Sequence, residues 1–167
     1  MQAWAQFYTA IAAASAALLG LLYVVVSINA AAALGPGEPV SRRLTEQAFQ
    51  NYLAVLMVAL LSLFAGISTV VFGAVTLAAT ASWSIWVIIR FAQTVMQGGE
   101  RRAWLGAVRR HLSSLIGFGM LLSAALRMAL NWADDYNWLA ASTLVLMFSA
   151  TTVSWELLTR IARRKPS

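Results

Sequence analysis

Long apolar runs, separated by short polar or glycine-containing breaks, dominate the chain. A membrane-spanning helix needs about 20 predominantly apolar residues, so a chain of 167 residues has room for roughly four to six of them. The runs predict five spans, over residues 7–30, 48–65, 70–89, 112–130 and 138–159.

The longest uncharged stretch covers residues 47–89. As one helix it would extend roughly 65 Å, about twice the thickness of the hydrocarbon layer. We therefore expect it to fold back near Gly66, with Ser68 or Thr69 capping the next helix, or alternatively near Gly73.

Turn-forming residues and charges mark the other boundaries. Residues 35–39, GPGEP, end the first span, and Ser41 is placed to cap the following helix. Residues 100–111 have an apolar side and an arginine-rich side, which predicts a short amphipathic helix lying on the membrane surface. Its candidate contacts with lipid head groups are Arg101, Arg102, Arg109 and Arg110. The predicted fold class is an all-α membrane bundle of five transmembrane helices plus this interfacial helix, in a single domain over residues 1–167.

The basic residues indicate the orientation. In the five-span arrangement, every Lys and Arg except Arg127 falls on one side of the membrane. The positive-inside rule makes this side the cytoplasm, where anionic lipid head groups are the expected partners. The N-terminus is then outside and the C-terminus inside.

Composition excludes the soluble classes. The chain is 60% hydrophobic and 11% charged, with a mean hydropathy of +0.73, whereas soluble domains are about 25% charged. The net charge of +6 fits cytoplasmic loops better than nucleic acid. The high Ala content and the preference for Arg over Lys favour a bacterial plasma membrane.

Catalytic and metal-binding signatures are weak. There is no Cys and a single His, His111, so we expect no enzyme activity, cofactor or metal.

Ionisable residues within a span are functional candidates by default. Arg127 can reach outward to Asp134 or Asp135, which would form an outer vestibule. Glu156 has Arg160 one turn further on, a favourable helical pair. Because both residues lie at the depth of the membrane interface, a structural role is our main interpretation. The alternatives are an anion-attracting Arg127 at an outer vestibule and Glu156 in an inner cation ring of an oligomer.

Small and hydroxyl-bearing residues recur at helical spacing on several spans. Such faces serve helix packing, and the same residues can line a pore. The candidate pore or packing face comprises Thr69, Gly73, Thr76, Thr80 and Ser84 in one span, and Ser149, Thr152 and Glu156 in another. Further small residues are Ala13, Ala17 and Gly20 in the first span and Ser113, Gly117 and Ala124 in the fourth.

The segment AIAAASAALLGLLYVVVSINA, residues 10–30, resembles the first span of small polytopic bacterial membrane proteins that are themselves uncharacterised. The resemblance implies a membrane fold and no particular function. The apolar run is longer than the core of a signal peptide, so we expect it to be retained as a span.

Two functional hypotheses follow. The first is a non-enzymatic membrane protein that self-assembles or serves as a subunit of a membrane complex, because small faces are abundant and no chemical site is evident. The second is a homo-oligomeric channel that passes small ions or solutes through a Ser/Thr-lined pore.

Overall fold

The computed structural model describes residues 2–35, 39–64, 68–96, 101–132 and 135–163. Within these ranges the regular structure is helical and there are no strands. The helices are α1 (Gln2–Ile28), α2 (Ala30–Leu34), α3 (Pro39–Ser62), α4 (Thr69–Met96), α5 (Arg101–Ala129) and α6 (Tyr136–Arg163). The predicted all-α class is confirmed.

Three stretches of the described residues are long and apolar enough to cross a membrane: Trp4–Ile28, Leu112–Ala129 and Tyr136–Arg163. In α4, Thr69–Ile85 is apolar but shorter. The first half of α3 carries the polar sequence SRRLTEQ, which lowers its hydropathy. These helices indicate a membrane protein, and the count of five spans stays a prediction.

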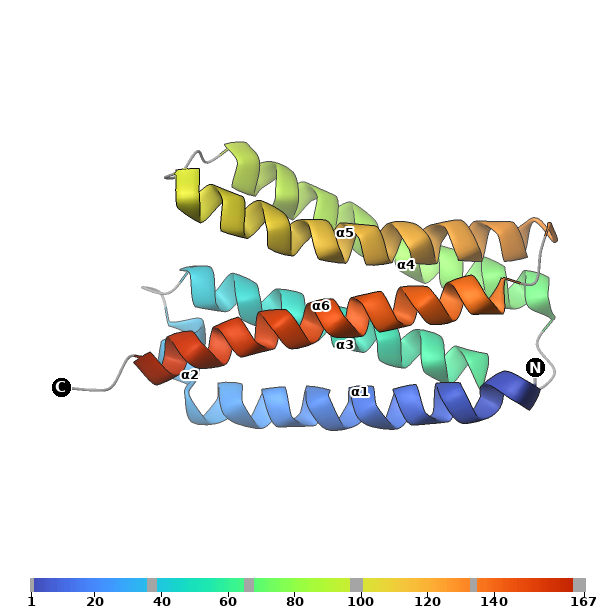
Figure 1. Ribbon diagram of the computed structural model, residues 1–167, viewed down its shortest axis with the longest axis horizontal. Coiled ribbons are helices and arrows are strands. Elements are labelled where there is room, and N and C mark those ends of the chain that lie inside the picture. Colours follow the sequence, from blue (N-terminus) through green and yellow to red (C-terminus); the bar gives the residue numbers. More distant parts are fainter. Residues whose placement is uncertain (1, 36–38, 65–67, 97–100, 133–134, 164–167) are drawn as a thin grey trace.

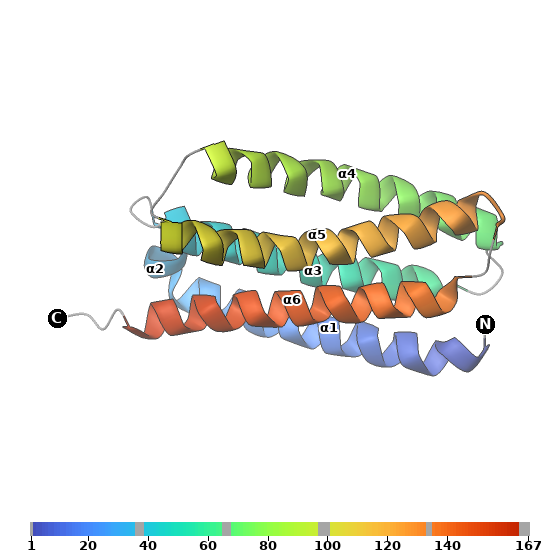
Figure 2. The ribbon, with the colours of Figure 1, turned by 45° about the horizontal axis from the view of Figure 1, so that its top comes forward.

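The long helices lie side by side in a fixed order of neighbours. α4 packs on α5, α5 on α6, α6 on α3, and α3 on α1 (Figure 1). Figure 2 shows the same bundle turned, with α4 and α1 on opposite sides of it. Because α1 and α4 stand at the two ends of this order, each has one main neighbour among the long helices.

Two apolar cores are distributed along the bundle. One contains Phe118, Leu121 and Leu146, together with Tyr8 and Phe72 from the end where α3 turns back into α4. The other lies toward α2 and contains Leu22, Val26, Leu44, Tyr52 and Leu157. Met147 packs against both cores.

The predicted fold-back is confirmed. α3 ends at Ser62 and α4 begins at Thr69, on either side of Gly66. The Ser68 hydroxyl accepts a hydrogen bond from the backbone N–H of Val71 at 3.3 Å, so Ser68 caps α4.

The start of α3 differs from the sequence prediction. Ser41 does not cap the helix, because α3 already begins at Pro39, and the Ser41 side chain is buried. Proline suits the first position of a helix, since its fixed φ angle is helical and its missing N–H would have no partner there.

The prediction of a separate interfacial helix over residues 100–111 is wrong. A single helix of 29 residues, α5, runs without a break from Arg101 to Ala129. No proline interrupts this sequence, so the backbone has no reason to bend at Leu112. Similarly, α4 continues past Arg90 to Met96.

α4 approaches the backbone of α5 closely at Gly73. A Cβ atom added there would clash with the backbone of α5, at 2.8 Å from the carbonyl carbon of Met128, at 2.9 Å from the carbonyl oxygen of Ala125, and against the amide nitrogen of Ala129. Backbone cannot move aside as a flexible side chain can, so this position requires glycine.

We expect Gly73→Ala to destabilise the protein by about 1–3 kcal/mol, as overpacking does. Gly117→Ala should cost less, because the added Cβ would meet the Leu146 side chain, which can adjust. Gly20→Ala is the matched control, since nothing lies within 4 Å of its added Cβ. It should be neutral or raise stability by up to about 1 kcal/mol, through helix propensity.

Reversible unfolding in mixed micelles, followed by the helical circular dichroism signal, measures all three variants. Equal stability of the Gly73 and Gly20 variants would contradict the assignment of the α4–α5 contact.

Candidate functional site

The polar face predicted on α4 is turned into the bundle. Gly73, Thr76, Thr80 and Ser84 are buried and Thr69 is partly buried. The Thr80 hydroxyl donates to the backbone oxygen of Thr76 at 2.6 Å. Among the described residues, the hydroxyls of Thr76 and Ser84 have no hydrogen-bond partner. This face therefore contributes mainly small size to the packing of α4 on α5.

The residues of the polar face predicted on α6 differ in burial, so they do not form one surface. Ser149 is fully buried, whereas Thr152 is exposed and its hydroxyl donates to the backbone oxygen of Ser149 at 2.8 Å. Glu156 forms the expected ion pair with Arg160, at 3.0 Å between Oε1 and Nη2. The Ser149 side chain forms hydrogen bonds to residues of α3 and α5.

An amide–hydroxyl cluster, which sequence reasoning missed, joins α3, α5 and α6. It consists of Gln47, Asn51, Ser113, Ser114 and Ser149. Asn51 Nδ2 donates to Ser114 Oγ at 2.9 Å and to Ser149 Oγ at 3.2 Å. Gln47 Nε2 donates to Ser114 Oγ at 3.0 Å. Of its members, Asn51, Ser114 and Ser149 are buried.

The direction of the remaining hydrogen bonds follows from counting donors. Ser114 Oγ accepts from two amides, so its own proton is best placed toward Ser149 Oγ, 3.0 Å away. Ser149 Oγ then accepts from Asn51 and Ser114, and its proton points to Ser113 Oγ at 2.9 Å. Among these five residues, the hydrogen bonds run from the two amides of α3 through Ser114 and Ser149 to Ser113.

The five side chains of the cluster are amides and hydroxyls. An amide N–H group donates hydrogen bonds but does not take up a proton near neutral pH. The cluster connects α3, α5 and α6 at one level. Its evident role is to fix the relative positions of α3, α5 and α6, as polar groups between membrane helices do.

At the opposite end of the bundle, the predicted pairing of Arg127 is confirmed for Asp135. Arg127 Nε lies 2.8 Å from Asp135 Oδ2, with the arginine side chain half exposed. Asp134 lies outside the described residues. Nearby, the Tyr8 hydroxyl donates to the backbone oxygen of Tyr136 at 3.3 Å and links α1 to α6. The proposed vestibule thus contains an ion pair rather than an isolated cation.

The starts of α3 and α5 and the end of α6 lie at one end of the bundle, here called the basic end (Figure 1). Arg42 and Arg43 are in the first turns of α3, and Arg160 and Arg163 are in the last turn of α6. α3 and α6 are antiparallel, and Asn51 meets Ser149 while Tyr52 meets Thr151. Extending this register along both helices places Arg42 level with Arg160. The backbone of residues 101–111 begins α5 at the same end. The side chains of Arg101, Arg102, Arg109 and Arg110 lie outside the described part.

Because the sequence contains no Cys, the candidate metal ligands are acidic and histidine side chains. Among the described residues, no group of three or more His, Cys, Asp or Glu side chains could hold a metal ion. No protein family model, curated protein or solved structure matches the chain.

We expect Ser149→Ala to destabilise the protein by about 1 kcal/mol, the usual net value of a hydrogen bond. Thr152→Ala is the matched control on the same helix, because the Thr152 hydroxyl bonds only within α6. It should leave stability within about 0.5 kcal/mol. A double-mutant cycle with Asn51→Leu should give a coupling of about 0.6 kcal/mol, typical of hydrogen bonds between membrane helices. Zero coupling would show that the cluster does not act as a unit.

Proposed function

We propose that this protein is a non-enzymatic integral membrane protein that assembles, with copies of itself or as a subunit of a membrane complex. In this proposal it spans a bacterial plasma membrane five times, with the basic end in the cytoplasm among anionic head groups. The position of Arg42, Arg43, Arg160 and Arg163 at one end of the bundle supports this orientation.

The observation that carries the proposal is the outer face of α1. Its buried side follows Tyr8, Ile11, Ala12, Ser15, Leu22 and Val26. The opposite side exposes Ala13, Ala17 and Gly20 at helical spacing, and nothing lies within 4 Å of a Cβ added to Gly20. Lipid tails gain nothing from small residues, whereas another helix can approach closely over them.

The channel is less well supported than assembly. Thr76, Thr80 and Ser84 are buried in the bundle, and Gly73 on the same face is in backbone contact with α5. A pore along this face would require α4 to separate from α5. The small face of α1 needs no such change in order to meet a partner.

The mass of the protein in nanodiscs, measured by native mass spectrometry, tests self-assembly. We expect wild type to be a dimer or larger oligomer. Ala17→Leu/Gly20→Leu should shift it toward the monomer, because two bulky side chains prevent close approach of another helix. Gly119→Leu is the matched control, since Gly119 is also exposed with nothing within 4 Å. Bulky exposed residues, among them Leu112 and Ile116, precede Gly119 on α5, whereas the exposed residues Ala13 and Ala17 precede Gly20 on α1.

A wild-type oligomer that persists in the α1 double variant would exclude this face as the interface. A wild-type monomer would exclude self-assembly and leave a heterologous membrane partner.

Ion and solute flux in proteoliposomes tests the channel. The flux should remain at the level of empty liposomes; flux that falls in Thr80→Leu would favour the channel instead.

A further inference from the structure

Tryptophans mark both ends of the exposed surface of α6. Trp138 is 46% exposed, and its ring N–H donates to the Ser123 hydroxyl of α5 at 2.9 Å. Leu144, Phe148 and Trp155 follow on the exposed side, and the last two are 71% and 70% exposed. No charged residue lies between the two tryptophans in the sequence. The part of α6 from Trp138 to Trp155, here called the apolar segment, is therefore suited to contact acyl chains.

The two exposed threonines within the apolar segment have hydrogen-bond partners in their own helix. The Thr151 hydroxyl donates to the backbone oxygen of Met147 at 2.9 Å. The Thr152 hydroxyl donates to the backbone oxygen of Ser149 at 2.8 Å. A polar group that is satisfied within its helix does not need water, so it can face hydrocarbon. These threonines therefore do not interrupt the apolar segment.

Ion pairs lie just beyond both ends of the apolar segment. Asp135 precedes the segment, and its Oδ2 lies 2.8 Å from Arg127 Nε. Glu156 follows the segment, and its Oε1 lies 3.0 Å from Arg160 Nη2. Tryptophan is enriched where acyl chains meet head groups, and charged side chains are costly at greater depth in the bilayer. The two tryptophans therefore mark where the contact with acyl chains ends.

The rise of an α-helix converts the apolar segment into a thickness. From Trp138 to Trp155 the axis of α6 rises about 25 Å, at about 1.5 Å per residue. Side chains on a helix lean toward its N-terminus, so this lean shifts both limits in the same direction and leaves their distance unchanged. A tilt of α6 shortens the thickness further. The apolar segment thus spans less than the typical hydrocarbon layer of about 30 Å.

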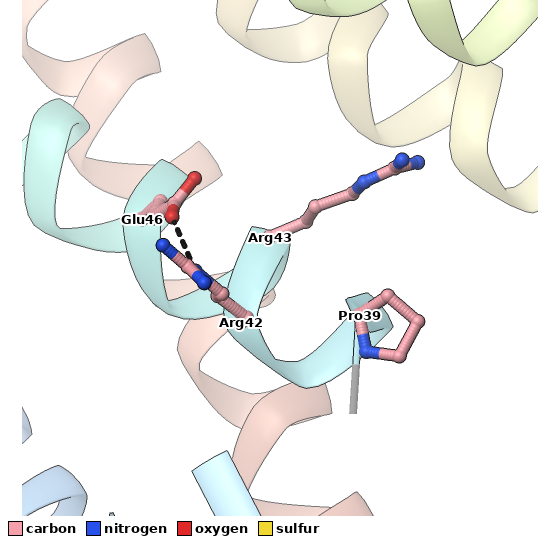
Figure 3. A pocket seen from close by; sticks show the side chains of 4 residues that line it. All are labelled: Pro39, Arg42, Arg43 and Glu46. Atoms are coloured by element: carbon pink, nitrogen blue, oxygen red, sulfur yellow. Dashed lines mark hydrogen bonds and ion pairs between the residues drawn. The ribbon is translucent and has the colours of Figure 1, made fainter. Parts of the chain in front are cut away.

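α3 gives a similar distance. Figure 3 shows Arg42 turned toward Glu46 at the start of this helix, where Glu46 Oε1 accepts from Arg42 Nε at 3.1 Å. Extending the register between α3 and α6 places Glu46 level with Trp155. Ser62, where α3 ends, comes level with Trp138. The axis of α3 rises about 24 Å between Glu46 and Ser62, so the distance between the polar ends is not peculiar to α6.

The side chains of the apolar segment favour lipid over another helix. Leu144, Phe148 and Trp155 are bulky and exposed, so they would hold the backbone of a neighbouring helix at a distance. Flexible acyl chains fill the spaces between such side chains. The small residues suited to close helix contact are exposed on α1 instead.

We infer that the exposed surface of α6 binds the acyl chains of a bilayer whose hydrocarbon layer is about 25 Å thick. The protein therefore prefers phospholipids with short acyl chains, because a thicker layer must deform to match it. This inference rests on the proposal that α6 spans a membrane, and it does not depend on self-assembly.

Quenching of tryptophan fluorescence by a brominated phospholipid tests the preferred thickness. The protein is reconstituted into a series of phosphatidylcholines of increasing chain length, each mixed with the same brominated lipid. The quenching gives the relative binding constant of each chain length. We expect the largest constant in a hydrocarbon layer of about 25 Å, and a fall of about twofold in a layer of about 30 Å.

Glu156→Leu/Arg160→Leu should move this optimum toward longer chains by up to about 5 Å, because it extends the apolar segment by about one helical turn. Glu156→Gln/Arg160→Gln is the matched control, since it removes the same ion pair but keeps polar side chains at both positions. Its optimum should equal that of wild type.

An optimum at about 30 Å or more in wild type would overturn the inferred thickness while leaving the membrane span intact. An unchanged optimum in the Leu variant, or the same shift in both variants, would overturn the limit assigned at Trp155. Quenching that does not exceed the level of a water-soluble protein would overturn the membrane span itself, and the proposed function with it.

A spin label tests whether lipid covers α6. Because the sequence contains no Cys, a nitroxide can be attached at the single cysteine of Phe148→Cys. In bilayers the label should be more accessible to oxygen, which dissolves in hydrocarbon, than to a water-soluble nickel chelate. A label that neither reagent reaches would show that protein covers this surface, which would overturn the lipid contact.

Discussion

The arrangement of the bundle depends on the hydrogen bonds that Asn51 makes to Ser114 and Ser149. Apolar side chains pack against lipid about as favourably as against another helix, so they do not determine which helices become neighbours. A buried amide without partners is costly in such surroundings, and Asn51 satisfies its donors only when α5 and α6 are both in place. One side chain on α3 therefore ties its helix to α5 and α6, whereas apolar residues of both cores pack α3 against α1.

Small residues determine how closely the helices approach one another. Their role differs between α4 and α1, the two outermost of the long helices. On α4, Gly73 brings the backbone into contact with α5, so the small face of α4 packs against another helix of the same chain. On α1, Ala13, Ala17 and Gly20 point away from α3. Small residues at helical spacing thus form a contact between helices of the same chain on α4, and an exposed face on α1. This contrast is why the two stripes support different interpretations.

Sequence reasoning predicted the helices well and their contacts poorly. The fold-back near Gly66 and its cap, Ser68, could be predicted because helix length and capping are local properties. The continuity of α5 was missed, because the arginines of residues 101–110 were taken to place this segment on the membrane surface, although nothing in the backbone ends the helix there. Asn51 was also missed. Residues 47–89 were analysed only for the absence of charge. The uncharged polar residues Gln47, Gln50 and Asn51 within this run are themselves a signal of contacts between helices. The partner of Gly73 could not be found at all, because it depends on which helix lies opposite.

The placement of polar groups is consistent with the proposal that the protein acts by assembly. Its described charged residues lie near the ends of the helices, where Arg127 pairs with Asp135 at one end and Arg42 and Arg160 pair with glutamates at the other. The middle of the bundle holds amides and hydroxyls that bond to one another. A carrier of ions or protons needs groups in the middle that change partners during transport. Here the Ser114 and Ser149 hydroxyls each have at least two partners within α3, α5 and α6, so moving any one of these helices would break several bonds at once. An interior fixed in this way favours a rigid bundle whose outer faces, rather than its core, meet other molecules.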